Sequence, residues 1–424
     1  MPLYLRNSTF INWKTFEFTK ANIMVEEGEQ GKIFILPGDL KIPDGNTIID
    51  CTGKYVTKAF ANGHHHVYSA LAKGMPAPKK NPVNFVEILK NVWWKLDRCL
   101  DQEMVRISAL ITAIESAKNG VTFVIDHHSS PNAIKGSLDI IAKAFDEVGI
   151  SHLLCYEISD RDGAAKTEQA LEETDSYLHH RQGLVGLHAS FTVGDSTFRK
   201  AVNLADDHNA GIHIHVAEDK YDQEHCNQQF QTSVIERIKS LGGLANSKTI
   251  LVHCLHLQDT ERRSIGASGA WVAQNTESNL NNRVGYFNSV GLGENIMLGT
   301  DGMHSDMLRA AKASYFIGLN NDKIDLPGIY FRFRNAQRYL IQNSFQGKGE
   351  NNLVVLDYKP QTEFNANNFL SHFIYGIESK HIQHVISSGR LIVNDRKLTS
   401  VDEDAICEAS TQLSKKLWQK MSQL

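Results

Sequence analysis

With 424 residues, of which 42% are hydrophobic, the chain is long enough to bury one large domain with an appendage, or to form up to about three domains. Its net charge of -4 at pH 7 comes from 44 basic and 48 acidic residues, and it predicts no basic surface of the kind that binds nucleic acid or an anionic membrane. We therefore expect a small-molecule partner, with no nucleic acid and no membrane.

The beginning of the chain, residues 1–13, alternates polar and apolar side chains and lacks the basic region and continuous apolar run of a signal peptide. No later stretch reaches the length of a transmembrane helix. The six cysteines are scattered without a C-x-x-C pair, which favours reduced thiols over disulfides. These features together predict a cytoplasmic protein.

Short strands and turns, with little helix, are expected at the start of the chain, over residues 4–50. Eight apolar runs then follow as strand candidates, at 56–66, 121–126, 151–156, 184–188, 211–216, 249–253, 270–275 and 295–300. Amphipathic segments separate them, such as 102–119, 133–148, 195–210 and 229–241, and several end at a glycine suited to a left-handed helix terminus: Gly120, Gly149, Gly211 and Gly242. This alternation predicts an α/β fold built on a closed parallel (β/α)8 TIM barrel.

Short strands return near the end of the chain, at 353–356, 385–387 and 390–393, with Ser388-Gly389 as a hairpin turn. Residues 403–423 have the pattern of an amphipathic surface helix. We therefore predict two domains. Residues 1–54 and 352–424 form a small β-sandwich domain, and residues 55–351 form the barrel.

The 19 histidines of the chain are clustered, and the first cluster, Gly63-His64-His65-His66, lies at the end of the first predicted barrel strand. Side chains alternate along a strand, so His64 and His66 face the same way and could bind one metal ion through two imidazole nitrogens. Barrel enzymes build their sites at this end of the strands. The motif alone leaves a metal site and core histidines about equally open.

Three further strands end in residues that can bind metal: His215 after strand five, His253 after strand six and Asp301 after strand eight. All of them point to the same mouth of the barrel, which favours a shared site over independent structural roles. Imidazoles combined with one carboxylate suit a single divalent ion, Zn2+ first and Fe2+ as the alternative, and leave a position for water.

Glu218, three residues beyond His215, is expected on the loop above this site. A carboxylate there could take a proton from a metal-activated water and pass it to the leaving group. The alternative is a solvated loop acid within Glu218-Asp219-Lys220.

Several motifs together carry a family resemblance: Gly63-His64-His65-His66, His215-Val216-Ala217-Glu218, Val252-His253-Cys254-Leu255-His256-Leu257, Asn275-Thr276-Glu277-Ser278-Asn279 and Gly299-Thr300-Asp301-Gly302. Over nearly its whole length the chain resembles the amidohydrolase superfamily, in its cytosine/guanine deaminase and chlorohydrolase-like branch. It is most similar there to SsnA-type aminohydrolases, through features such as Trp93-Trp94-Lys95-Leu96-Asp97 and Asp126-His127-His128-Ser129.

The resemblance implies a site with one metal ion, whose ligands are His64, His66, His215 and Asp301. It implies that His253 binds the attacking water more than the metal, and that Glu218 and Asp301 shuttle protons. Relatives with two metals carry a bridging lysine at the end of strand four, where this chain has Leu187-His188. One metal is therefore expected.

The resemblance also indicates substrate contacts. It implies that His188 contacts the substrate and that Asn279 lines the pocket, while Asp97 replaces the longer glutamate with which relatives read their substrate. Only one of His127 and His128 can face the mouth of the barrel, and we predict His128.

Three aromatic residues precede Asp97 in the segment between the first barrel strand and the first barrel helix. Trp93, with Trp94 and Phe85, could form a lid over a flat ring, or could be ordinary packing. His65, His213 and His256 are read as supporting or core residues.

The function predicted from these features is a metal-dependent aminohydrolase, in which a metal-activated water attacks a C–N bond of a nitrogen heterocycle. The same site could instead cleave a cyclic amide or displace chloride. A non-catalytic binding or scaffold relative and a metal-dependent isomerase or lyase are alternatives from other classes. A homodimer is compatible with the resemblance.

Overall fold

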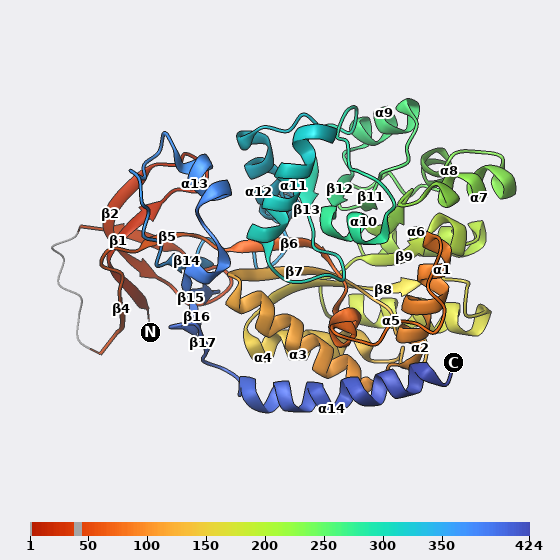
Figure 1. Cartoon of the computed structure of the whole chain (residues 1–424), viewed down its shortest axis with the longest axis horizontal. Coiled ribbons are helices and arrows are strands. Elements are labelled where there is room, and N and C mark those ends of the chain that lie inside the picture. The colour runs from red at the N-terminus through yellow and green to blue at the C-terminus, as the bar shows by residue number, and fades with distance from the viewer. Residues whose placement is uncertain (1, 38–44) are drawn as a thin grey trace.

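The computed structural model of the chain describes residues 2–37 and 45–424. Its centre is an eight-stranded parallel sheet in which every strand pairs with the next one along the chain (Figure 1). The strands are β6 (Phe60–His65), β7 (Val121–His128), β8 (Ser151–Ile158), β9 (Val185–Ala189), β10 (Ile212–Val216), β11 (Ile250–His253), β12 (Trp271–Gln274) and β13 (Ile296–Leu298). The (β/α)8 barrel predicted from the sequence is confirmed.

The barrel closes between its first and last strands. A parallel bridge joins His65 to Asp301, and the backbone N–H groups of Thr300 and Asp301 both donate to the His64 carbonyl oxygen, at 3.0 and 3.1 Å. The bonds that close the barrel therefore also fix the backbone that carries the predicted metal ligands.

Helices follow most of the barrel strands and cover the outside of the sheet, except α10, which lies at the mouth of the barrel (Figure 1). They are α3 (Gln102–Lys118), α4 (Ser137–Val148), α5 (Ala164–Leu178), α6 (Asp195–Asp207), α7 (Lys220–Phe230), α8 (Val234–Ser240), α9 (Asp259–Ser268), α10 (Thr276–Asn282), α11 (Met307–Asn321) and α12 (Leu326–Gln342). The predicted helix 229–241 is wrong in its first part, because α7 ends at Phe230 and α8 begins only after a short break.

The glycines at the helix ends have two different roles. Gly120, Gly149 and Gly242 have positive φ, as expected for helix termini. Gly211 does not, so the role predicted for it is wrong. A Cβ atom on Gly211 would lie 2.3 Å from the carbonyl carbon of Lys248, so glycine is needed there because two backbone segments approach closely.

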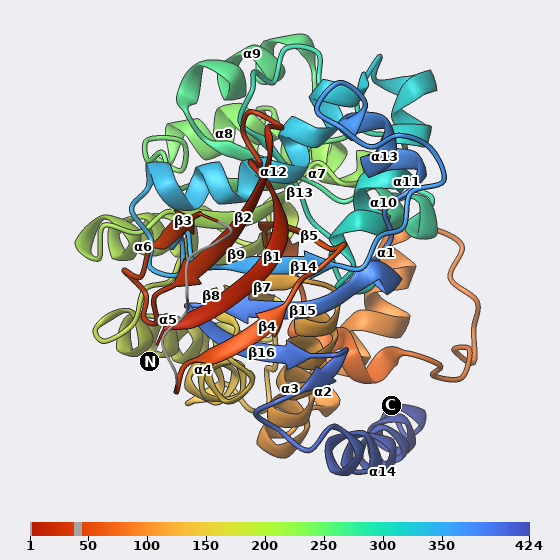
Figure 2. The same cartoon turned by 90° about the vertical axis from the view of Figure 1, so that its left-hand side faces the viewer.

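Strands from both ends of the chain form one nine-stranded sheet beside the barrel (Figure 2). They are β1 (Leu3–Ile11), β2 (Phe18–Val25), β3 (Ile33–Leu36), β4 (Thr47–Asp50), β5 (Tyr55–Lys58), β14 (Leu353–Leu356), β15 (Ile382–Ser387), β16 (Arg390–Asn394) and β17 (Lys397–Leu398). This is the terminal β domain expected from the sequence. Residues 38–44 of the predicted β region lie outside the described residues, and the domain boundaries remain a prediction.

The predicted first barrel strand, 56–66, is in fact two strands. β5 lies in the terminal sheet, where it pairs with β1 and β14, and only β6 belongs to the barrel. The break falls at Ala59, whose N–H donates to the carbonyl of Asn352. The apolar run continues through both strands because both are buried, so hydrophobicity could not reveal the break.

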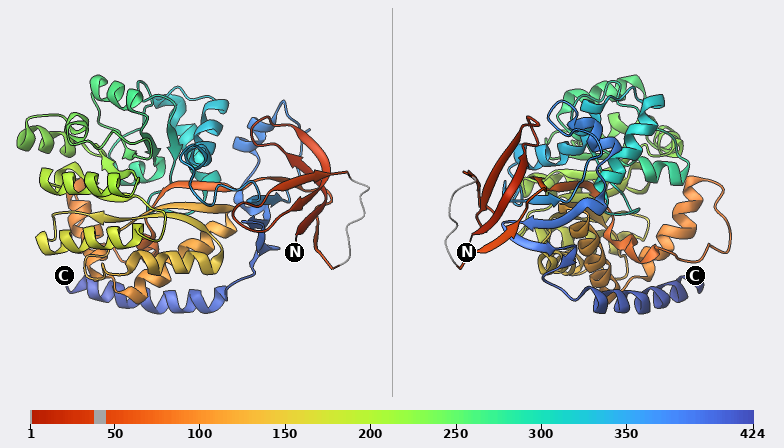
Figure 3. Two further views of the ribbon diagram at one scale, coloured as in Figure 1. Left: turned by 180° about the vertical axis from the view of Figure 1, so that it is seen from behind. Right: turned by 60° about the vertical axis from the view of Figure 1, so that its left-hand side comes forward.

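The last helix, α14 (Glu403–Ser422), runs along the outside of the barrel beside α3 (Figure 3). Trp418 Nε1 donates to the Leu71 carbonyl oxygen at 2.9 Å, and the Lys420 ammonium lies 2.8 Å from an Asp101 carboxylate oxygen. The surface helix predicted at the end of the chain is confirmed. Within the described residues, no helix has both the length and the apolar character needed to cross a membrane.

Candidate metal centre

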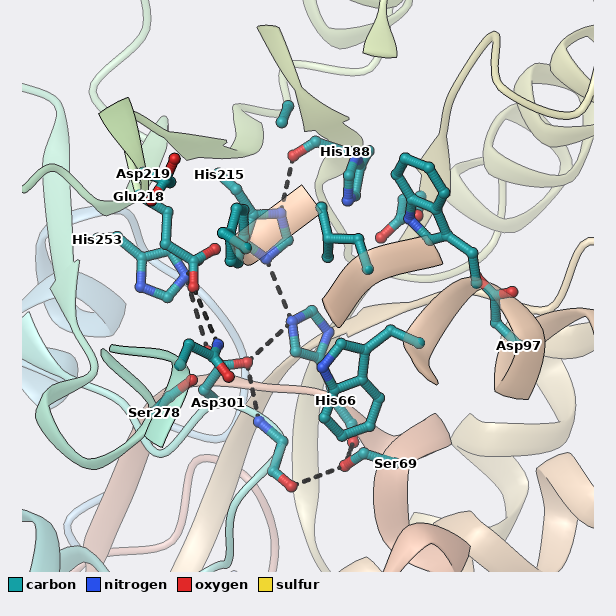
Figure 4. Close-up of a pocket in the computed structure, with 18 of the residues that line it drawn as sticks. His66, Ser69, Asp97, His188, His215, Glu218, Asp219, His253, Ser278 and Asp301 are labelled. Atoms are coloured by element: carbon teal, nitrogen blue, oxygen red, sulfur yellow. Dashed lines mark hydrogen bonds and ion pairs between the residues drawn. The ribbon is translucent and has the colours of Figure 1, made fainter. Parts of the chain in front are cut away.

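The predicted metal ligands converge at the carboxyl ends of β6, β10 and β13. His64 lies within β6 and His66 directly follows it, His215 lies near the end of β10, and Asp301 follows β13 after two residues. All four side chains are buried. Figure 4 shows His66, His215 and Asp301 pointing toward one another from these separate strands.

The distances between the ligand atoms fit one divalent ion. His66 Nε2 lies 3.2 Å from His215 Nε2 and 3.1 Å from Asp301 Oδ1, and His64 Nε2 lies 3.8 Å from the same Asp301 oxygen. Ligand atoms about 2 Å from a tetrahedral zinc ion are about 3.3 Å apart. The cluster therefore has the size that zinc requires.

The hydrogen bonds on the far side of the imidazoles show which nitrogens are free. His66 Nδ1 lies 2.6 Å from the His127 carbonyl oxygen, and His215 Nδ1 lies 2.8 Å from the His188 carbonyl oxygen. A carbonyl oxygen can only accept, so both Nδ1 atoms carry hydrogen, and in the neutral imidazoles both Nε2 atoms direct lone pairs into the cluster. These two lone pairs, with His64 Nε2 buried and without a hydrogen-bond partner, form a donor set that a cation would satisfy.

A second histidine orients His64. His64 Nδ1 lies 3.0 Å from His213 Nε2, and His213 Nδ1 lies 3.5 Å from Cys155 Sγ. If His64 binds metal through Nε2, its Nδ1–H donates to His213, and the second hydrogen of this chain lies on His213 Nδ1. The supporting role predicted for His213 therefore has a specific form, which is to fix the tautomer of a ligand.

We predict that His213→Asn lowers the affinity for Zn2+ about 10- to 100-fold, because loss of an outer hydrogen bond leaves a ligand imidazole poorly oriented. Competition with a chelating dye measures this affinity. His128→Asn is the matched control, since His128 is equally buried at a strand end but bonds Ser130 Oγ, at 2.9 Å, instead of a ligand. Equal zinc affinities for the two variants would contradict the role of His213.

Glu218 and His253 lie together on one side of Asp301 (Figure 4). His253 Nε2 lies 3.4 Å from Glu218 Oε2 and 3.7 Å from Asp301 Oδ2. Asn279 Nδ2 lies 2.8 Å from His253 Nδ1, and donation by this amide leaves the imidazole hydrogen on Nε2. His253 thus presents an N–H donor to the site, which suits a contact with water better than a bond to metal.

Burial, together with the negative charge of Asp301, raises the pKa of Glu218 well above its ordinary value. The Asn282 amide donates to Glu218 Oε1 at 3.2 Å and holds the side chain in place. A carboxyl group with a raised pKa, fixed beside the ligand cluster, is suited to accept and return protons near neutral pH.

The strand ends that carry these groups have an unusual backbone. Ala217, His253 and Asp301 have φ values of 45°, 70° and 53°, a left-handed conformation that costs a non-glycine residue roughly 1–3 kcal/mol. The backbone bonds from Asp301 to His64 and from Cys254 N to the Val216 carbonyl, at 3.0 Å, hold this conformation in place. Left-handed turns directly at the predicted site residues are typical of functional sites.

The cavity above the cluster has an aromatic wall. Phe85, Leu89, Trp93 and Trp94 line it from a continuous helical stretch made of α1 (Phe85–Ile88), a π-helical turn (Leu89–Trp93) and α2 (Trp94–Cys99). π-helical turns occur often at functional sites. The aromatic segment predicted from the sequence therefore lines the cavity, and its role as a lid stays a prediction.

His188 and Asp97 also line the cavity, as predicted, but Asp97 is already engaged. Its carboxylate makes a buried ion pair with the Arg161 guanidinium and accepts a hydrogen bond from Ser129 Oγ at 3.0 Å. Its second oxygen, Oδ1, is buried and has no hydrogen-bond partner. Only this oxygen is left for a substrate.

Two predicted substrate contacts lie elsewhere. His128 does not line the cavity, because its ring turns toward Ser130 and Tyr156, and His127 is the histidine that packs against the ligand imidazoles. Asn279 does not line the cavity either, since it lies behind His253. Both predictions are corrected.

Sequence reasoning missed Glu157, Arg161 and Asn282. Glu157, near the end of β8, lines the cavity, and its Oε1 lies 3.3 Å from an Arg161 nitrogen. The available signal was an acid at the end of a predicted barrel strand, followed four residues later by a base. Asn282 could have been found only from its contact with Glu218.

Comparison with known proteins identifies the family of the chain. Residues 55–326 match the model of the amidohydrolase family. The chain is 25% identical to a 5-methylthioadenosine/S-adenosylhomocysteine deaminase of Thermoanaerobacter pseudethanolicus, over 99% of this chain and 100% of the relative. It is 27% identical to a 5'-deoxyadenosine deaminase of Methanopyrus kandleri, over 84% of this chain and 85% of the relative.

Solved structures share the fold. A zinc-bound adenosine deaminase from Xanthomonas campestris superposes with a TM-score of 0.83 at 18% identity, over 98% of both chains. A zinc complex of atrazine chlorohydrolase from Arthrobacter aurescens TC1 gives a TM-score of 0.80 at 15% identity, over 97% of this chain and 100% of that one. At these identities the likeness concerns the fold alone.

Proposed function

The chain belongs to the amidohydrolase family, and we propose that it is a metal-dependent aminohydrolase that removes an amino group from a nitrogen heterocycle. The observation that carries the proposal is the convergence of His66 Nε2 and His215 Nε2, 3.2 Å apart, with Glu218 and His253 beside them. The residues present fit a metal ion and a proton carrier at one cavity.

In this proposal His64, His66, His215 and Asp301 hold one divalent ion, with Zn2+ as the first candidate because imidazole nitrogens and one carboxylate suit it. Such an ion lowers the pKa of water to about 7 and so supplies a nucleophile at neutral pH. No lysine ends β9, so a carboxylated lysine that bridges two metals has no place here.

Glu218 moves the protons. In the proposed reaction water adds to the carbon that bears the amino group, ammonia leaves, and the carbon becomes a carbonyl. The Glu218 carboxylate accepts a proton from the water through Oε2 and gives it to the ring nitrogen next to the reacting carbon. The position of Oε2 beside His253 and Asp301 supports this assignment.

His253 and Asp301 complete the proton path. The Nε2–H of His253 donates a hydrogen bond to the attacking water and orients it toward the substrate. Asp301 Oδ2, 3.7 Å from this nitrogen, takes the second proton toward the departing ammonia. His253 is thus a partner of the water and leaves metal binding to the other four side chains.

The substrate we propose to test first is a 6-aminopurine nucleoside, because the relatives carry the names of deaminases of such compounds. The aromatic wall of Phe85, Trp93 and Trp94 suits a flat ring. His188 lies next to Trp94 in this wall, with ring centroids 6.0 Å apart, and its Nδ1 is bonded to Thr192 Oγ1 at 2.7 Å, so its other nitrogen is available to the substrate.

A panel assay tests the proposed function. We expect the zinc-loaded protein to release ammonia from at least one compound among aminopurine nucleosides, aminopurines, aminopyrimidines and pterins. Cyclic amides and chlorinated triazines belong in the same panel, since ring opening or chloride release without ammonia would replace deamination by one of the alternative reactions. A zinc-loaded protein that binds a panel member without any turnover would instead indicate a binding protein.

A further inference from the structure

His127 and Glu157 face each other beside the metal ligands, in an arrangement that the proposed reaction does not use. His127 Nδ1 lies 3.6 Å from Glu157 Oε2. Both side chains are buried, and His127 Nδ1 has no hydrogen-bond partner among the described residues. The separation is too long for a hydrogen bond. It is close to the spacing of about 3.3 Å between two ligands of one tetrahedral ion.

The tautomer of His127 determines which ring nitrogen faces Glu157. His127 Nε2 lies 3.2 Å from the Leu187 carbonyl oxygen, which can only accept, so this nitrogen carries the hydrogen. Nδ1 therefore presents a lone pair to a carboxylate. Two buried acceptors directed at the same small space are satisfied by a cation between them.

A third ligand atom lies within reach of the same space. The ligand atoms of His127, Glu157 and His215 all lie within 4.8 Å of one another. His215 can contribute only Nε2, because its Nδ1 bonds the His188 carbonyl. Two imidazole nitrogens and a carboxylate oxygen again form the donor set that zinc prefers.

The charges around Glu157 favour an additional cation. Arg161 is shared by three carboxylates, those of Asp97, Glu157 and Asp162. Arg98 lies 2.7 Å from Asp162 and adds a second positive charge, so the group carries three negative charges and two positive ones. Arg161 approaches Oε1 of Glu157, and Oε2 stays free for another partner.

We propose that His127, Glu157 and His215 form a second position for a divalent metal ion, next to the first position formed by His64, His66, His215 and Asp301. The two positions share the single free nitrogen of His215, so they exclude each other. The second position lacks Asp301, the residue that connects the first one to His253. It is therefore a holding position for the ion, away from the groups that move protons.

The test uses the double variant His66→Asn/Asp301→Asn, stripped of metal and titrated with Zn2+ alone. We expect it to bind about one equivalent of zinc, measured as metal content after gel filtration, and to lose this binding when His127→Asn or Glu157→Gln is added. His128→Asn, added in the same way, is the matched control and should leave the zinc bound. Zinc detected by anomalous diffraction in crystals of the double variant should lie between His127 and Glu157.

Absence of zinc from a folded double variant would overturn the proposal, and so would zinc that persists after His127→Asn. If the double variant does not fold, His64→Asn/Asp301→Asn carries the same test, because His64 is a ligand of the first position only. The readouts are metal content and ion position. Rejection of the second position therefore leaves the proposed aminohydrolase activity standing, and an inactive wild-type protein would not reject the second position.

Discussion

Replacing Glu218 with glutamine is expected to lower kcat about 10³-fold while the metal content of the protein stays unchanged. Glutamine has nearly the same shape and can still bond Asn282, but it cannot take a proton from water. The Glu218 carboxyl is not one of the four ligand groups and lies beside His253 instead, 3.4 Å from its Nε2. Steady-state kinetics on the substrate found by the panel assay, with metal analysis of the same sample, measures both quantities.

The control for this variant is Asp219→Asn at the next residue. Asp219 also lines the cavity, and it caps helix α7 by accepting a hydrogen bond from Tyr221 N at 2.9 Å, which asparagine can also do. We expect this change to leave kcat within a few-fold of the wild type. A Glu218→Gln protein with most of its activity would remove Glu218 from the mechanism, and one without metal would make it a ligand.

The parts of the site that could be predicted from the sequence are those that depend on strand ends. His64, His66, His215 and Asp301 each follow or end an apolar run, and the barrel brings these ends together whatever the details of the loops. The alternation of side chains along β6 was enough to separate His66 from His65, whose Nδ1 bonds Thr300 instead, at 3.2 Å.

The parts that could not be predicted depend on how loops return to the site. At the end of β7 alternation shows that His127 and His128 face opposite ways, but contacts with neighbouring strands, which no local pattern encodes, decide that His127 packs against His215 and His128 turns to Ser130. Asn279 lies on helix α10 beyond β12, where period-two reasoning no longer applies. The ion pair between Asp97 and Arg161 joins segments 64 residues apart, and no local pattern encodes it.

In the fold, too, local sequence patterns revealed some features, and others depended on contacts between distant elements. Burial on both faces made the barrel strands recognisable as apolar runs, yet it concealed the change of sheet between β5 and β6. Gly211 resembled a helix terminus, but the close approach of the Lys248 backbone explains it. Local signals thus located the elements, and contacts between elements decided the role of individual residues.

The hydrogen bonds of the proposed ligand imidazoles indicate a site whose shape does not depend on a bound metal. The carbonyl groups of His127 and His188 fix His66 and His215 with their lone pairs directed inward, and His213 does the same for His64. His64 Nε2 is buried without a hydrogen-bond partner among the described residues, and a bound ion would give it one. The ion is therefore expected to contribute to the stability of the folded chain as well as to its chemistry.

Removal of the metal should accordingly abolish activity and lower the midpoint of thermal unfolding by about 3 °C, and reloading with Zn2+ should restore both. An ion that binds only the folded state adds about 2.7 kcal/mol at a free concentration 100 times its Kd. Bonds from the ion to His66 Nε2 and His215 Nε2, 3.2 Å apart, would be part of this stabilisation. Differential scanning calorimetry of the stripped and reloaded protein measures it.

Mg2+ is the control ion, since it prefers six oxygen ligands and a cluster of imidazoles suits it poorly. We expect Mg2+ at the same concentration to leave the stripped protein inactive and its unfolding midpoint unchanged. A stripped protein as stable as the zinc-loaded one would show that the facing nitrogens of His66 and His215 are satisfied without an ion. Full activity in the stripped protein would contradict the metal-dependent mechanism itself, because no other group in the described site would lower the pKa of the attacking water to near neutrality.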